Sequence, residues 1–202
     1  MYNAMIIVVV MFDFSWTILM NCYTCPEERR GVMAEMTAAG VPANTIAWTV
    51  LMKAHSSPQQ RRAVLDEMRE AGVQPDATTW NTLSRSCLTT SALRAMMQEM
   101  AAAGVAADVA TFNMLMKMKA HSSPQQRRAV LAEMREAGVQ PDAMSWNTLL
   151  ISYRSSPRAS ADMREVMGEM QAAGVVPDVS TWNTLMSSYS EPADLRGVMQ
   201  EM

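Results

Sequence analysis

The chain repeats one short pattern about six times, and this periodicity constrains the fold more than any other feature of the sequence. A large aromatic residue recurs at intervals of 32 to 36 residues. An Ala-Gly-Val tripeptide and a Glu-Met dipeptide keep the same register, so chance does not explain the pattern. Such periods are typical of solenoids, in which each repeat packs on its neighbours. The aromatic positions are Trp16, Trp48, Trp80, Phe112, Trp146 and Trp182.

Two segments of the chain are almost identical. Residues 53–77 and 119–143 differ only where Asp66 in the first segment corresponds to Ala132 in the second. The segments begin 66 residues apart, which is the length of two repeats. This indicates duplication of a two-repeat block, and therefore repeats that stack interchangeably.

Each repeat begins with a predicted helix that carries the aromatic residue. Asp76 precedes such a segment, and aspartate is a favoured N-cap residue. Trp80, Leu83 and Cys87 follow at spacings of three and four, which place them on one helical face.

A second helix is predicted to complete each repeat. Ser57 and Pro58 are a suitable N-cap and first helical residue. Val64 and Met68 lie four residues apart and mark the apolar face. Gly72 then supplies the left-handed residue that commonly ends a helix. One hairpin cannot bury its apolar face alone, so we expect an all-α stack of helix–turn–helix repeats.

Composition and charge narrow the classes of function. The formal net charge is −3 and the isoelectric point is near 5.4, so nucleic-acid binding would require a local basic face. Three cysteines do not suggest a disulfide framework. No run reaches the roughly 18 apolar residues that a membrane span requires. The apolar segment 1–12 lacks the basic residues of a signal peptide.

The repeat resembles the pentatricopeptide repeat (PPR). The resemblance rests on Val-Pro-Asp-Val-Ser-Thr-Trp-Asn-Thr-Leu-Met at 176–186, followed by Tyr189, and on Val-Met-Gly-Glu-Met-Gln-Ala-Ala-Gly-Val at 166–175. The tetratricopeptide pattern of Trp, Leu-Gly and Tyr in the first helix is absent. Most repeats are shorter than the usual PPR, and the shortening falls between the helices.

The resemblance implies a right-handed α-solenoid and defines its repeats. One solenoid is expected over 13–202, after the segment 1–12. Neither end carries a polar cap, so we expect either that the chain is a fragment of a longer array or that a partner covers the ends. The expected repeats are 13–44, 45–76, 77–108, 109–142 and 143–178, with an incomplete repeat at 179–202.

The resemblance also implies that each repeat reads one base of single-stranded RNA. In the family, the residue after the aromatic residue and the last residue of the repeat choose the base. The first set is Thr17, Thr49, Asn81, Asn113, Asn147 and Asn183, and the second is Asn44, Asp76, Asp108, Asp142 and Asp178. By analogy the target reads A-G-U-U-U. The alternative is that the second set only caps helices.

Two further sets of residues bear on RNA binding, the cations of the first helices and the residues that would clamp a base. Cations in the first helices would contact phosphates, and the alternative is that they only solvate helix ends. These cations are Lys53, Arg85, Lys117, Lys119 and Arg154. The apolar residue that would clamp a base lies two positions before the aromatic residue, where small side chains predict weak stacking. This position holds Phe14, Ile46, Thr78, Ala110, Met144 and Ser180.

No motif in the sequence indicates catalysis, a metal or a cofactor. Cys22 and Cys25 form a lone CxxC with no second pair, and they fill ordinary repeat positions. His55 and His121 are interpreted as variable packing positions. Phosphate-binding glycine loops, nucleophile elbows and paired carboxylates are not found.

Two functions remain open, and neither is enzymatic. The first is an organellar binding protein that contacts single-stranded RNA through its concave face. The second is a structural subunit that holds proteins in a large organellar assembly. The expected location, a mitochondrion or plastid, comes from the family resemblance alone.

Overall fold

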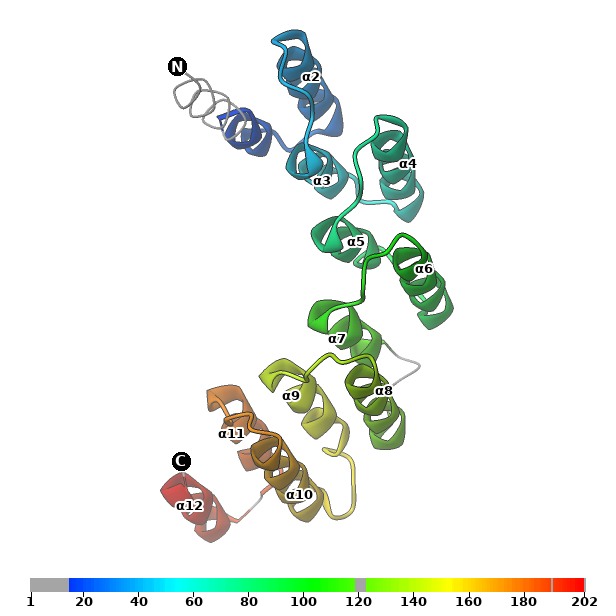
Figure 1. Ribbon diagram of the computed structural model, residues 1–202. Coiled ribbons are helices and arrows are strands. Elements are labelled where there is room, and N and C mark those ends of the chain that lie inside the picture. Colours follow the sequence, from blue (N-terminus) through cyan, green and yellow to red (C-terminus); the bar gives the residue numbers. More distant parts are fainter. Residues whose placement is uncertain (1–14, 119–122, 190, 202) are drawn as a thin grey trace, which may run out of the picture. The chain divides into compact units, whose positions relative to one another are not determined.

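A computed structural model describes residues 15–118, 123–189 and 191–201, and the predicted segment 1–12 lies outside these residues (Figure 1). The described residues contain helices and turns and no strand. The chain divides into two compact units, Met1–Ala106 and Ala107–Met202, and each is described by itself.

The described residues of the first unit contain a helical segment at 15–22 and five further helices. Its first helices pack on one another, and each second helix packs on the first helix of its own repeat or of the next. This produces two layers, in which the first helices line one side (Figure 1). The elements are α2 (Pro26–Ala38), α3 (Thr45–Ala54), α4 (Pro58–Glu70), α5 (Ala77–Ser84) and α6 (Thr90–Ala102).

The second unit has the same organisation. Helices α7, α9 and α11 pack in succession, α8 lies against α7 and α9, and α10 lies against α9 and α11. Both units therefore confirm the all-α fold of stacked helix–turn–helix repeats. The elements are α7 (Val109–Lys117), α8 (Pro124–Glu136), α9 (Ala143–Ser152), α10 (Ala159–Ala172), α11 (Val179–Met186) and α12 (Pro192–Glu201).

The helices begin where the sequence predicts. The Asp76 side chain caps α5 by accepting a hydrogen bond from the Thr79 amide at 2.8 Å. Ser57 caps α4 through the Gln60 amide at 3.1 Å, and Pro58 is its first residue. Each cap satisfies a backbone donor that has no partner inside the helix.

The second helices end at glycines in the left-handed region. Gly72 has φ +75°, its amide donates to the Arg69 carbonyl, and the Val73 amide donates to the Met68 carbonyl at 3.0 Å. No atom lies within 4 Å of where a Cβ would be, so backbone conformation rather than space requires glycine here.

The core lies between the two layers and uses the predicted apolar faces. Trp80 and Trp146 are fully buried, as are Val64 and Met68. The prediction for Cys87 was wrong in one respect: α5 ends at Ser84, so the half-buried Cys87 lies in the following turn.

An arginine in α2, in α4 and in α8 ties its repeat to the next. Arg61 of α4 donates from Nε to the His55 carbonyl at 2.7 Å and from Nη1 to the Thr82 carbonyl of α5 at 2.9 Å. Arg29 makes the same pair of contacts with Tyr23 and Val50. Arg127 bonds the Thr148 carbonyl in the second unit. Buried Leu93 and Met163 fill this position in α6 and α10.

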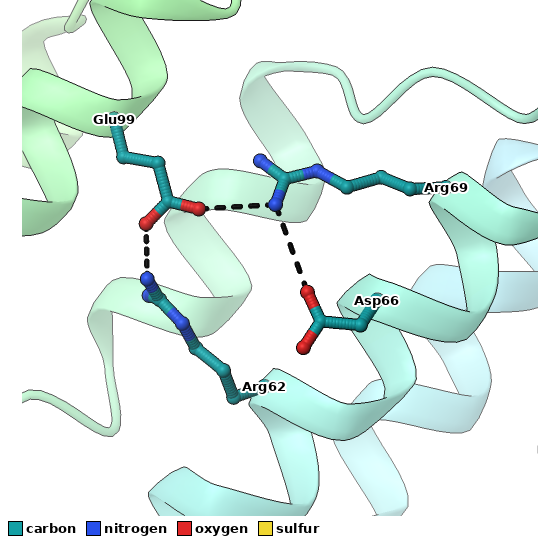
Figure 2. A network of polar contacts seen from close by, with 4 residues as sticks. All are labelled: Arg62, Asp66, Arg69 and Glu99. Carbon is teal, nitrogen blue, oxygen red and sulfur yellow. Dashed lines mark hydrogen bonds and ion pairs between the residues drawn. The ribbon is translucent and has the colours of Figure 1, made fainter.

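Ion pairs add a second link between neighbouring second helices. Glu99 of α6 accepts from Arg62 and from Arg69, and Arg69 also lies 3.7 Å from Asp66 (Figure 2). In the second unit Arg128 pairs with Glu169 at 2.8 Å and stacks over the Tyr153 ring. These side chains are half-exposed, so each pair contributes at most about 1 kcal/mol.

Candidate nucleic-acid interface

The proposed closing residues of the repeats are all helix N-caps. Each accepts a hydrogen bond from the backbone amide three residues later, as Asp142 does from Ser145 at 2.8 Å. The capping role predicted as the alternative is therefore real, and a role in base reading would be additional. The five caps are Asn44 on α3, Asp76 on α5, Asp108 on α7, Asp142 on α9 and Asp178 on α11.

In the second unit the two residues of each predicted reading pair contact each other. Asn113 of α7 donates from Nδ2 to Asp142 Oδ1 at 3.1 Å. Asn147 of α9 makes the same bond to Asp178 Oδ1 at 3.2 Å. Residues about 30 positions apart thus form one polar site per repeat.

A hydroxyl group links the reading pair in the first unit. Thr49 Oγ1 lies 3.1 Å from Thr79 Oγ1, and Thr79 donates to Asp76 Oδ1 at 2.8 Å. The residue three positions after the cap therefore belongs to the site. Sequence reasoning missed it, although its signal is visible as a hydroxyl side chain three residues after four of the five caps.

The remaining predicted readers are placed as follows. Half-buried Thr17 lies in the helical residues 15–22, and Asn44 caps α3. Asn81 lies in α5 of the first unit, and Asp108 caps α7 in the second. Asn183 is exposed on α11.

Burial differs between the two members of a pair. Thr49, Asn113 and Asn147 are only 3%, 4% and 8% exposed. Asp142 and Asp178, in contrast, are exposed. Solvent therefore reaches the carboxylates, whereas the Asn amides and the Thr49 hydroxyl are almost completely buried.

Hydrogen bonds keep these carboxylates ionised. The Thr181 amide and hydroxyl lower the pKa of Asp178, and Asn147 adds to the effect. For Asp142, partial burial opposes ionisation, but bonds from Ser145 and Asn113 outweigh it and the pKa is lowered. At neutral pH both are acceptors for an N–H group of a ligand.

The positions expected to clamp a base are on the surface. Ile46 is 57% exposed and Met144 is 51% exposed, and Thr78, Ala110 and Ser180 are exposed as well. Of the clamp positions in the described residues, Ile46 and Met144 offer a sizeable apolar surface for stacking. Phe14 lies outside the described residues.

The predicted phosphate contacts are exposed cations without acidic partners. Within the described part of the chain, Lys53, Arg85, Lys117 and Arg154 form no ion pair. Lys117 Nζ lies 3.2 Å from Met144 Sδ, which places a cation beside a stacking position. Lys119 is outside the described residues.

Some cations of the second helices have acidic partners, as Arg30, Arg62 and Arg128 do. Arg30 is neutralised by two bonds to Glu67, at 2.6 and 2.8 Å.

Lys53 and Lys117 lie in the last turns of α3 and α7. Arg85 and Arg154 were expected within first helices but follow the ends of α5 and α9, so these cations gather at the C-terminal ends of first helices.

The other motifs remain ordinary repeat positions. Cys22 donates from Sγ to the Ile18 carbonyl, and Cys25 precedes α2 as its N-cap residue. Among the described residues no three His, Cys, Asp or Glu side chains gather as metal ligands would. His55 is the C-cap residue of α3. Its two ring nitrogens are buried and have no hydrogen-bond partner among the described residues. His121 is outside the described residues.

Stacked two-helix repeats define the class of α-solenoid repeat proteins. The sequence profile of the pentatricopeptide repeat domain matches residues 31–88, 95–155 and 129–192. The chain belongs to the pentatricopeptide repeat family. No curated protein matches it by sequence. In the described residues no helix is both long enough and apolar enough to span a bilayer.

Solved structures agree with this fold. The PPR domain of Arabidopsis thaliana protein-only RNase P 1, solved in complex with tRNA, is 22% identical, with a TM-score of 0.52 over 71% of this chain and 79% of that one. PPR10 with an 18-nucleotide psaJ RNA element is 21% identical, with a TM-score of 0.65 over 85% of this chain. Maize PPR10 is 21% identical, with a TM-score of 0.59 over 96%. The chain spans 26% and 29% of these PPR10 structures.

Proposed function

We propose that this chain binds single-stranded RNA through its first helices, at one base per repeat, with the target A-G-U-U-U in chain order. The observation that carries the proposal is the Asn113–Asp142 pair, in which an amide donor and an ionised acceptor share one site. Uracil presents a carbonyl acceptor beside an N–H donor, which complements this pair. The proposal assigns no catalytic step to the chain, and a mitochondrial or plastid location is proposed from the family.

The first test separates base reading from capping at one residue. Asp142→Asn keeps a good N-cap for α9, because asparagine caps as well as aspartate. It replaces the ionised acceptor by an amide, so the preference for uracil at the fourth position should fall at least several-fold. Helix content, followed by circular dichroism, should stay unchanged. Unchanged preference for A-G-U-U-U over A-G-U-C-U in a fluorescence titration would contradict base reading by Asp142.

The second test uses salt to detect phosphate contacts. Each contact adds about 0.7 to the slope of log affinity against log salt for a single strand. Lys117→Gln should lower the slope by about this amount. Arg30→Gln makes the same change in net charge but removes a cation that Glu67 already neutralises. It is the matched control, and equal slopes for the two variants would refute a phosphate contact at Lys117.

A protein-binding scaffold in an organellar complex is the second candidate. It is favoured by exposed apolar side chains at the end of the fifth repeat and in the last one, where Val176 is 82%, Val179 69% and Met199 64% exposed. A partner covering these residues would bury apolar surface that water now contacts. Failure of the full chain to bind A-G-U-U-U better than scrambled RNA would favour this candidate over RNA binding.

A further inference from the structure

Ser145 is a buried hydroxyl in contact with both members of a reading pair. It is fully buried and is the third residue of α9. Its Oγ lies 2.6 Å from Asn113 Oδ1 and 2.9 Å from Asp142 Oδ1. Its hydroxyl proton can therefore be shared between the amide oxygen and the carboxylate.

These contacts define how the Asn113 amide is turned. Nδ2 faces the carboxylate of Asp142, which can only accept, and Oδ1 faces the hydroxyl of Ser145, which can donate. Rotating the amide by half a turn would place Oδ1 against the carboxylate and lose both bonds, and only a bond from Nδ2 to the Ser145 oxygen could replace them. One N–H of Nδ2 and the second carboxylate oxygen remain for a ligand.

The following repeat lacks the second of these contacts. Asn147 donates to Asp178, but its Oδ1 is buried and has no hydrogen-bond partner in the described residues. Thr181 occupies the same helix position as Ser145 and is also fully buried, yet its hydroxyl donates to Asp178 Oδ1. The Asn147 amide is therefore held by one bond, and the Asn113 amide by two.

We propose that Ser145 is a positioning residue that holds the Asn113 amide in a donor-only orientation, so that the fourth repeat rejects cytosine more strongly than the fifth. The inference rests on the proposed function. Cytosine presents an amino donor where uracil has a carbonyl, and this donor would face the Nδ2–H of Asn113. At Asn147, the unpartnered Oδ1 can turn to accept that amino group, because only the bond to Asp178 opposes the rotation.

The test compares three variants of the full chain on three RNAs. The probes contain A-G-U-U-U, A-G-U-C-U or A-G-U-U-C, and the readout is the ratio of affinities for uracil and cytosine at one position. Ser145→Ala should reduce the ratio at the fourth position by about threefold to tenfold, the value of one lost hydrogen bond. Ser145→Thr restores a hydroxyl and should recover the ratio. Ser152→Ala is the matched control: it removes a hydroxyl from the same helix that bonds the Leu149 carbonyl and lies outside the reading pairs, so it should leave the ratio at the fourth position unchanged.

A second measurement follows the amide without RNA. In nitrogen–proton correlation spectra, Ser145→Ala should move the side-chain signals of Asn113 and accelerate their exchange with water, while thermal melting confirms that the variant is folded. Discrimination that Ser145→Ala leaves unchanged, or unmoved Asn113 signals, would overturn the role of Ser145 alone. A wild-type chain that binds none of the probes would overturn the proposed function and this inference with it.

Discussion

Replacing Arg61 by methionine should uncouple the second and third repeats of the first unit. Arg61 is the half-buried cation whose Nε and Nη1 bond the carbonyls of His55 and Thr82. The Thr82 carbonyl lies in the last turn of α5, where carbonyls lack partners inside the helix. Methionine keeps most of the aliphatic packing and removes both bonds, so the loss isolates the polar contribution.

The expected cost follows from the two contacts. A hydrogen bond from a charged donor contributes about 1.5 to 3 kcal/mol. The lower value applies to each bond because the side chain is partly exposed and burial already lowers the pKa of Arg61. We therefore expect Arg61→Met to reduce the free energy of unfolding by about 3 kcal/mol. The contact with Thr82 joins two repeats, so its loss weakens the interface between neighbouring repeats of the solenoid. The unfolding transition should therefore also broaden.

Arg62→Met is the matched control for this prediction. Arg62 is the next residue, carries the same charge and pairs with Glu99, but its side chain is 47% exposed. Such a pair is worth at most about 1 kcal/mol. Urea unfolding followed by circular dichroism measures both variants. Equal losses for Arg61→Met and Arg62→Met would refute the argument that the carbonyl contacts, rather than the charge, hold the repeats together.

Two further perturbations test the helix ends. Gly72→Ala should lower the free energy of unfolding by about 1 to 2 kcal/mol because alanine is strained at φ +75°. Gly31→Ala, inside α2, should instead raise it by about 0.5 to 1 kcal/mol. A change of the same sign for both variants in urea unfolding would contradict the assignment of Gly72 as a left-handed helix end. The pKa values of Asp142 and Asp178 are lowered in the folded state, so their stabilising effect is present above the ordinary carboxyl value near pH 4 and is lost as pH falls through the lowered values. Asp178→Asn, which cannot titrate, should lose less stability between pH 5 and pH 2 than the wild type in acid unfolding.

The elements themselves could be predicted because their signals are local. Ser57, Pro58 and Gly72 act on backbone groups within four residues of themselves, and α4 begins and ends where they indicate. The family could be predicted for a related reason, since a repeated local pattern survives in the sequence whatever the packing. Cys87 shows where this reasoning fails, because helical spacing does not reveal that α5 stops at Ser84.

The site was predicted residue by residue but not as an arrangement. The sequence indicated Asn113 and Asp142 as candidates, and the fold brings them to 3.1 Å. Arg61 gave no signal of its role, and the recurring hydroxyl to which Ser145 belongs was missed. Arg61 contacts Thr82, 21 positions away in sequence, and Ser145 contacts Asn113, 32 positions away. Whether such residues meet depends on how far one hairpin is shifted and rotated against the next.

The sequence by itself thus determined the repeat, its two helices, their ends and the residues available in each site. Periodicity and capping chemistry act over a few residues, and any copy of the repeat carries them. Only the tertiary structure decided which side chains meet, because contacts such as Ser145 with Asn113 arise when first helices pack side by side. The fourth and fifth repeats differ for this reason. Both present Asn and Asp in the sequence, and it is the packing that leaves Asn147 Oδ1 without a hydrogen-bond partner in the described residues.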